Sequence, residues 1–361
     1  MIRPDGQGPA LAFYAPMKPP DHPTPSGDRQ IARLTLAALA RAGYGARTVS
    51  SLRALEMTGA PEAQAGIIAR AGEEAEWLVD CLAPSPPVAW LTYHCYYKAP
   101  DLVGPVVSAA LGLPYLITEP SISPRRRAGP WARFAAASDA AIAHADRLLW
   151  TTPRDLPALE AAGHGAKLRH LPAFLDPGPP VPPRAAGAPL RLLTVAMMRP
   201  GAKIESYRRL AAALAHLAPD WELTVIGGGE GEATVAELLA PYRSRVSFLG
   251  TIADPAVIRT HCAASDLMVW PGVDEGVGMV WLEAQAAGLP VVAEDGPAAR
   301  SLIAGGVLAP PDAPRALAAA IDRAAAERQT LSARGRAHVE AHHSIDAAAQ
   351  TLRHVLREVG A

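Results

Sequence analysis

Short apolar segments recur along the whole chain, and longer stretches rich in alanine and leucine follow them. The segments close on small or polar residues, as strands that are buried on both faces do. Their alternation with helical patterns is typical of βα units whose strands run parallel. Six strands are predicted in the first half, at residues 10–15, 46–50, 87–93, 114–118, 147–151 and 167–172. Six more are predicted in the second half, at residues 190–197, 222–227, 245–250, 266–270, 290–293 and 306–309.

A proline-rich segment, DPGPPVPPRAAGAPL at 176–190, separates the two series. Its prolines exclude a helix and the interior of a sheet. We therefore predict an α/β chain with two doubly wound, Rossmann-like domains, at 1–178 and 190–344, joined by a linker at 179–189. Residues 345–361 have the pattern of an amphipathic helix that could pack back on the N-terminal domain. Ligands are expected at the carboxyl ends of the strands, where the domains would face each other across a cleft.

Composition excludes several functional classes. The chain of 361 residues has 34 basic and 35 acidic residues, and this balance provides no field that would attract nucleic acid. The three cysteines are scattered, which supports neither a disulfide framework nor a zinc site. No apolar run reaches the roughly 18 residues of a membrane-spanning helix. We expect a cytoplasmic protein, with peripheral contact at a membrane as an open alternative.

One segment of the second half combines a strand, a glycine turn and a helix. The predicted strand ends at Pro271, and Gly276 and Gly278 allow the chain to turn sharply. The pattern from Val280 to Ala287 is helical, and Gly288 is placed as a C-terminal cap. Such a turn at the carboxyl end of a strand is a typical location for a ligand site.

Two glutamates, Glu275 and Glu283, flank the predicted start of this helix. The amide groups of Val277, Gly278 and Met279 would be free there and, with the helix dipole, would form an anion site. Glutamates beside such a site suit a ligand with phosphates for the amides and hydroxyls for the carboxylates. The alternative is a loop glutamate and a helix-surface glutamate that bind nothing.

The segment resembles the signature of GT-B-fold retaining glycosyltransferases of family 4 (glycosyl transferases group 1), which use nucleotide-sugar donors. The matching residues are Glu275, Gly276, Gly278, Glu283, Ala284, Ala286, Gly288, Pro290 and Val291. The resemblance extends over about residues 190–300 and includes LTVIGGGEGE at 223–232. In the first half it concerns the layout of the elements more than individual residues. It implies the GT-B fold, with two Rossmann-like domains.

The resemblance also implies roles for the donor-side residues. Arg199 and Lys203 would hold the donor diphosphate together with the amides of the glycine turn. Two cations and helix amides can stabilise a departing diphosphate without a metal, and the chain contains no Asp-x-Asp motif. Glu283 would accept hydrogen bonds from the ribose, and Glu275 would contact the transferred sugar and act in catalysis without serving as a covalent nucleophile. We therefore predict no metal and no cofactor.

The remaining predicted contacts involve the base and the acceptor. The backbone at Gly250, Thr251 and Ile252 would contact the nucleotide base, and Gly27 would lie near the acceptor and the transferred sugar. His94 follows a predicted strand and could bind the acceptor or a sugar hydroxyl. Alternatively, it packs among Tyr93, Tyr96 and Tyr97 without a functional role.

Two further features of the first half leave the acceptor side open. Members of the family often have a catalytic histidine after a later strand, and here Glu119 stands at that place. The basic cluster Arg125, Arg126 and Arg127 could contact an anionic lipid or acceptor, but a solvated loop is the preferred interpretation.

These observations predict a retaining glycosyltransferase that moves a hexose from a UDP- or GDP-sugar to a glycan, lipid or small-molecule acceptor, as in polysaccharide biosynthesis. One alternative is a catalytically silent nucleotide-sugar-binding partner in a polysaccharide assembly complex. Another is a dinucleotide-dependent oxidoreductase, but no G-x-G-x-x-G opens a helix after a strand.

Overall fold

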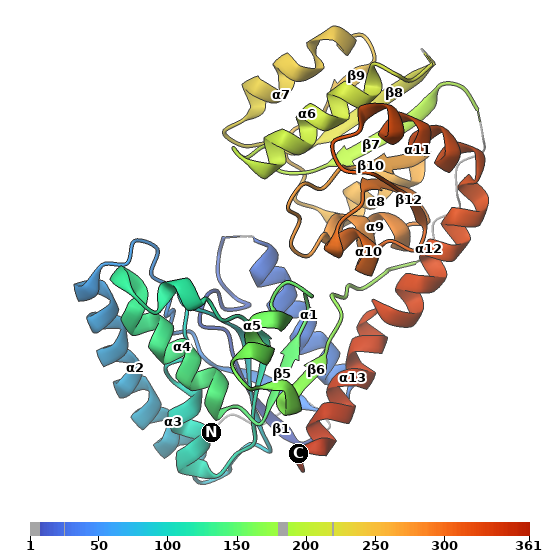
Figure 1. Ribbon diagram of the computed structural model, residues 1–361. Helices are drawn as coiled ribbons and strands as arrows, with labels where there is room; N and C mark the ends of the chain where they lie inside the picture. Colours follow the sequence, from blue (N-terminus) through green and yellow to red (C-terminus); the bar gives the residue numbers. More distant parts are fainter. Residues whose placement is uncertain (1–7, 25, 180–186, 219) are drawn as a thin grey trace. The chain divides into compact units, whose positions relative to one another are not determined.

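The computed structural model describes residues 8–24, 26–179, 187–218 and 220–361, which form two compact units (Figure 1). The first unit contains the chain up to Ala173 together with Ile345–Ala361, and the second contains Phe174–Ser344. The chain passes from one unit to the other twice, after Ala173 and after Ser344. These two positions are close together, since Leu175 and Ser344 form a parallel bridge. Of the predicted linker at 179–189, residues 180–186 lie outside the described part of the chain.

The first unit contains a six-stranded sheet in the order β2-β1-β3-β4-β5-β6, and every pairing is parallel. The strands are β1 (Ala10–Tyr14), β2 (Gly45–Ser50), β3 (Trp90–Cys95), β4 (Tyr115–Pro120), β5 (Arg147–Trp150) and β6 (Leu168–His170). All six strands predicted in the first half are thereby confirmed. The largest difference in a boundary is at β3, which begins at Trp90 rather than at residue 87.

Helices cover both faces of this sheet (Figure 1). They are α1 (Gly27–Arg41), α2 (Pro61–Leu82), α3 (Gly104–Leu111), α4 (Ala132–His144), α5 (Leu156–Ala161) and α13 (Ile345–Glu358), with short 3₁₀ helices η1 (Pro124–Arg126), η2 (Gly129–Trp131) and η3 (Gly165–Lys167). Leu78 of α2, Val107 of α3 and Ile142 of α4 share one core with Trp90 and Tyr115 of the strands. Full burial of such a side chain stabilises the fold by about 1.5–3 kcal/mol.

The last helix of the chain, α13, belongs to the first unit and packs against α1 (Figure 1). Its buried residues repeat at helical spacing and form one apolar face: Ile345, Ala348, Ala349, Leu352, Val355 and Leu356. Polar contacts fix both of its ends. Arg41 of α1 forms an ion pair with Asp346 at 2.7 Å, and Glu358 accepts hydrogen bonds from Arg147 and Arg169.

The second unit contains another parallel sheet, in the order β12-β11-β10-β7-β8-β9. Its strands are β7 (Leu190–Val195), β8 (Trp221–Ile226), β9 (Val246–Phe248), β10 (Leu267–Val269), β11 (Val291–Glu294) and β12 (Gly306–Ala309). Its helices are α6 (Ala202–Leu214), α7 (Glu232–Leu239), η4 (Ala240–Tyr242), α8 (Pro255–Ala264), α9 (Met279–Ala286), α10 (Pro297–Leu302), α11 (Pro314–Ala326) and α12 (Arg328–His342). The six strands predicted in the second half are also confirmed.

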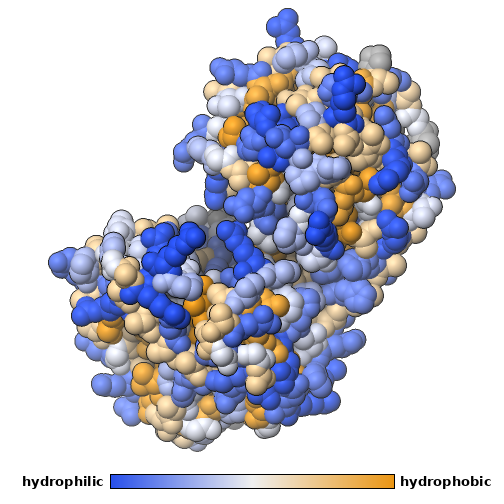
Figure 2. All heavy atoms as spheres, viewed as in Figure 1, coloured by the Kyte–Doolittle hydropathy of each residue, from blue (hydrophilic) through white to orange (hydrophobic). Residues whose placement is uncertain are grey.

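On the side seen in Figure 2, hydrophilic and hydrophobic residues intermingle over both units. Within the described residues, none of the helices has the length and apolar character that a membrane crossing requires.

Candidate functional site

The order of each sheet reverses at one point, and the loops at that point are where doubly wound folds bind ligands. In the second unit the reversal lies between β7 and β10, which are neighbours in the sheet. In the first unit it lies between β1 and β3. The loop after β7 contains Arg199, and the loop after β10 contains Glu275. The topology therefore brings together predicted donor-side residues that are more than 70 positions apart in the sequence.

The loop after β10 is shaped by residues with left-handed backbone. Gly272, Asp274 and Gly278 have φ angles of 73°, 49° and 63°. A Cβ at Gly278 would lie 2.4 Å from the Trp281 ring, so only glycine fits there. Helix α9 then begins at Met279, one residue before the prediction. Within the described residues, the amides of Val277, Gly278 and Met279 donate to no hydrogen-bond acceptor.

The C-terminal cap of α9 is the predicted one. Gly288 has a φ of 75°, its amide donates to Gln285 O, and the amide of Leu289 donates to Ala284 O. This pair of bonds defines a Schellman motif, which satisfies carbonyls at the helix end. The motif ends the helix directly before β11 and so fixes the length of the element that bears Glu283.

Lys203 and Glu275 form an ion pair at the reversal point of the second sheet. Lys203 Nζ lies 2.6 Å from Glu275 Oε2, with exposed side-chain fractions of 30% and 15%. The indole of Trp270 donates from Nε1 to the same carboxylate oxygen at 3.1 Å. Lys203 Nζ also lies 5.4 Å from the centre of the Trp270 ring, within cation–π range. The sequence predicted both charged residues at this site, and it did not predict their direct contact or the contribution of Trp270.

Helix α6, which carries Lys203, is tied to the β10 loop by several contacts. Ser206 Oγ accepts a hydrogen bond from the amide of Val273 at 3.0 Å. The Tyr207 ring packs edge-on against Trp270 at 5.1 Å, and its hydroxyl donates to Ala196 O at 3.0 Å. Because these partners are buried, the first two turns of α6 and the β10 loop are held in one arrangement.

Arg199 is exposed, and among the described residues it has no hydrogen-bond or ion-pair partner. The loop that bears it packs against the glycine loop after β8. The amide of Met198 donates to Gly228 O at 2.9 Å, and the amide of Gly231 donates to Met198 O at 2.8 Å. A Cβ at Gly229 would lie 2.6 Å from Met198 O, so the two backbones can approach only because that residue is glycine.

The predicted nucleotide-binding residues lie around the same edge of the sheet. Gly250, with a φ of 66°, accepts a hydrogen bond from the amide of Gly227, which joins the loops after β8 and β9. Thr251 and Ile252 follow in that loop. Glu283 is exposed on α9, yet the surrounding protein removes enough water from its carboxyl to raise the pKa to about 7.

The first unit gathers charged groups at its own reversal point. His94 and Glu119 lie one residue before the ends of β3 and β4, while Asp28 lies at the start of α1 beside Gly27. His94 Nδ1 is 3.7 Å from Asp28 Oδ1 and 3.9 Å from Glu119 Oε2, distances longer than a hydrogen bond. Nδ1 is buried and has no hydrogen-bond partner within the described residues. In the described part of the chain, the imidazole therefore has an unsatisfied polar atom.

Electrostatics of this cluster favour a charged imidazole. Burial lowers the pKa of His94, but the carboxylates of Asp28 and Glu119 outweigh burial, and the net pKa is raised. Burial raises the pKa of Glu119, His94 opposes this rise, and Asp28 and Asp155 add to it. The sequence had marked His94, Glu119 and Gly27. It missed Asp28, whose only signal was its position directly after Gly27.

The basic cluster Arg125–Arg127 lies in and after η1 and is exposed. Arg127 forms an ion pair with Asp139 at 2.7 Å, and the Arg126 guanidinium lies 5.2 Å from the centre of the Tyr97 ring. These local contacts account for two of the three arginines without a ligand.

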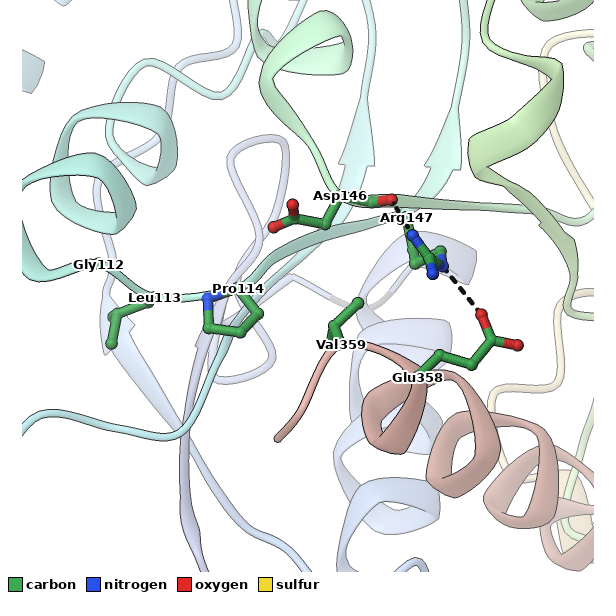
Figure 3. Close-up of a pocket in the computed structure, with 7 residues that line it drawn as sticks. All are labelled: Gly112, Leu113, Pro114, Asp146, Arg147, Glu358 and Val359. Carbon is green, nitrogen blue, oxygen red and sulfur yellow. Dashed lines mark hydrogen bonds and ion pairs between the residues drawn. The ribbon is translucent and has the colours of Figure 1, made fainter.

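A pocket of about 380 Å³ lies elsewhere in the first unit. Its lining includes Pro114 and Asp146, which precede β4 and β5, and Glu358 and Val359 at the end of α13 (Figure 3). These residues mark the amino ends of the strands, opposite to the edge where the fold places ligands. The Arg147 side chain in it donates to Glu358 at 2.9 Å and so already has an acidic partner.

No group of three or more histidine, cysteine, aspartate or glutamate side chains within the described ranges is arranged to hold a metal ion.

Comparison with known proteins finds a family match within the second unit. Residues 189–327 match the family model of glycosyl transferases group 1. A stretch of 151 residues, 38% of this chain, is 33% identical to a GDP-mannose-dependent monoacylated alpha-(1-6)-phosphatidylinositol monomannoside mannosyltransferase of Corynebacterium glutamicum. The match spans 39% of the length of that relative.

Solved structures resemble the whole chain. Sucrose-phosphate synthase from Thermosynechococcus elongatus has a TM-score of 0.70 at 21% identity, over 98% of this chain and 99% of its own. The Anabaena protein HepE in complex with UDP and glucose has a TM-score of 0.68 at 18% identity, over 96% of this chain and 99% of its own. The chain thus has the GT-B fold, and its residues 189–327 match the family model of glycosyl transferases group 1.

Proposed function

We propose that this protein is a retaining glycosyltransferase. It transfers a hexose from a UDP- or GDP-sugar to a glycan, lipid or small-molecule acceptor, without a metal. One observation carries the proposal: Lys203 at the start of α6 contacts Glu275 at the reversal point of the second sheet, beside Arg199 and the amides of 277–279, which donate to no acceptor within the described residues.

The cations and amides serve the leaving group. As the sugar departs, negative charge grows on the diphosphate, and preorganised donors stabilise that charge more than they stabilise the bound donor. Arg199 is exposed and has no partner in the described chain, so it is available to a phosphate. Lys203 exchanges its contact with Glu275 for one with the diphosphate, and the amides of Val277, Gly278 and Met279 complete the anion site.

The two glutamates bind hydroxyl groups. Glu283 accepts from the ribose, and Glu275 orients the transferred sugar without forming a covalent bond to it. The backbone at Gly250, Thr251 and Ile252 contacts the base. The relative in Corynebacterium is GDP-mannose-dependent, and HepE is in complex with UDP, so both bases remain candidates.

On the acceptor side we propose His94, with Gly27 close to it. Within the described residues, Nδ1 of His94 has no hydrogen-bond partner, and two carboxylates lie close to it. This supports the assignment, because a hydroxyl of the acceptor can supply the missing hydrogen bond. Whether the imidazole or the Glu119 carboxylate contacts the reacting hydroxyl is decided by comparing His94→Asn with Glu119→Gln.

The function is tested by a thermal-shift panel of UDP, GDP, ADP and their sugars, followed by assays of hydrolysis and transfer. A ligand at about 100 times its Kd adds about 2.7 kcal/mol to the free energy of unfolding. We expect stabilisation by UDP- or GDP-sugars and turnover that a chelator does not reduce. Full activity in the double variant Glu275→Ala, Arg199→Ala would contradict the mechanism.

The second candidate is a catalytically silent nucleotide-sugar-binding partner in a polysaccharide assembly complex. It is favoured by Glu119, which replaces the histidine that the resemblance leads us to expect, and by the family match at 189–327, which does not include the first unit. It predicts saturable nucleotide binding in calorimetry without turnover. Detected turnover of any donor would exclude it.

A further inference from the structure

We infer that Trp270 is a positioning residue for Glu275: its indole N–H holds the carboxylate in the orientation that the sugar requires. This inference rests on the proposed function, because it assigns a supporting residue to the same donor site. No feature of the signature requires an indole at this position, since the sequence pattern there asks only for a buried strand end.

The contact is specific to one oxygen of the carboxylate. Trp270 Nε1 and Lys203 Nζ both donate to Glu275 Oε2, at 3.1 and 2.6 Å. Within the described residues, Oε1 accepts no hydrogen bond. Two donors on Oε2 therefore fix the rotation of the carboxylate and leave Oε1 as the oxygen that meets a ligand hydroxyl.

Trp270 is the fixed member of this pair of donors. Its side chain is fully buried, and Tyr207 packs against the ring at 5.1 Å. Lys203 has a flexible stem, and 30% of its side chain is exposed. When the donor diphosphate takes over the ammonium group, Glu275 loses its bond to Lys203. Of the groups that the structure describes, the indole N–H of Trp270 is then the one that still donates a hydrogen bond to Oε2.

The chain offers a matched control in Trp281. This tryptophan is also buried, and it packs against Gly272 and Gly278 of the same loop. Its Nε1 has no hydrogen-bond partner within the described part of the chain. Trp281→Phe, in α9 next to the same loop, therefore makes the same indole-to-phenyl change as Trp270→Phe without removing a hydrogen bond.

The experiment compares wild type, Trp270→Phe, Trp281→Phe, Glu275→Gln and the double variant Trp270→Phe, Glu275→Gln in steady-state transfer or hydrolysis of the preferred nucleotide sugar. A hydrogen bond to a charged group contributes enough to change a rate by roughly tenfold or more. We expect kcat to fall roughly tenfold in Trp270→Phe while the donor KM changes less than twofold. Trp281→Phe should stay within about twofold of wild type in both constants. In the Glu275→Gln background, Trp270→Phe should have no further effect.

Different results contradict the positioning role of Trp270 and the proposed function. If Trp270→Phe and Trp281→Phe give the same kcat, or if Trp270→Phe acts fully in the Glu275→Gln background, the positioning role is wrong and the proposed function is unaffected. If the wild type turns over no nucleotide sugar, the proposed function fails, and full activity in Glu275→Gln would contradict the role of Glu275 in the proposed mechanism. Should Trp270→Phe unfold at a lower temperature than Trp281→Phe, Trp270→Met replaces it under the same kcat criterion, because methionine fills irregular buried space.

Discussion

His94 and Glu119 are the second-last residues of neighbouring parallel strands and share the left-handed backbone conformation, with φ angles of 60° and 51°. Residues other than glycine rarely adopt this conformation, which costs on the order of 1–3 kcal/mol for each. Such strain persists where the surrounding structure imposes it, and it is concentrated at functional sites. Here the two turns place an imidazole and a carboxylate within 3.9 Å of each other beside Asp28.

The first prediction concerns the charge on His94. Its pKa is raised above the ordinary value of 6.5, so its charged form contributes stability that is fully present below pH 6.5 and is lost as pH rises through the folded-state pKa. Asparagine tolerates left-handed backbone, so His94→Asn removes the charge without adding strain. We expect the difference in Tm between wild type and this variant to be largest below pH 6.5 and to shrink toward pH 9. His216→Asn, on an exposed histidine of the second unit, is the control, and parallel profiles for both variants would refute the prediction.

The second prediction concerns Arg199. If this side chain stabilises the leaving diphosphate, Arg199→Ala should lower kcat/KM for the donor by about 10²–10³ with little change in Tm, since the side chain is exposed. The control is Arg243→Ala, an exposed arginine that precedes β9 at the opposite edge of the same sheet. If Arg199→Ala and Arg243→Ala have the same kcat/KM for the donor, Arg199 does not stabilise the leaving diphosphate.

The third prediction uses the pKa of about 7 at Glu283. A carboxylate that accepts from the ribose must be deprotonated, so the donor Kd should fall as pH rises from about 6 to 8 and then level off. Glu283→Gln should weaken binding about 10–100-fold above pH 8 and remove this pH dependence, because bonds to charged groups are worth about 1.5–3 kcal/mol. Calorimetric titration at several pH values measures both effects. A wild-type Kd that does not vary with pH would contradict the assignment.

The fourth prediction separates two glycines of the signature. A Cβ at Gly278 would meet the Trp281 ring at 2.4 Å with φ at 63°, whereas a Cβ at Gly276 would have no neighbour within 4 Å. Gly278→Ala should therefore lower the free energy of unfolding by about 2–5 kcal/mol, and Gly276→Ala should leave stability nearly unchanged. If the donor lies against Gly276, Gly276→Ala will nonetheless raise the donor KM. Thermal unfolding and donor kinetics on both variants test this, and equal losses of Tm would disprove the steric argument.

Sequence patterns predicted all twelve strands, because strands buried on both faces appear as apolar runs and prolines or glycines mark their ends. The residues that resemble the glycosyltransferase signature placed Lys203 and Glu275 in one predicted site. They could not show that these residues bind each other, because the pairing depends on which strands are neighbours at the reversal of the sheet. The role of Trp270 was hidden for another reason. A tryptophan at a buried strand end indicates packing, and only the position of its N–H relative to Glu275 reveals a polar contact.

The left-handed backbone at His94 and Glu119 could not be predicted from the sequence either, since mainly glycine and asparagine favour that conformation. Glu119 was recognised only as a departure from a familiar pattern. The polar environment around it depends on the end of β3, the start of α1 and Asp155 directly before α5.

The first unit is built from both ends of the chain, since α13 packs its apolar face on α1. Because residues 345–361 follow the whole second unit in the sequence, the surface of α1 that receives α13 is covered only after the second unit has been synthesised. A break in the chain just before Ile345 would therefore leave the second unit whole and expose an apolar helical face on the first.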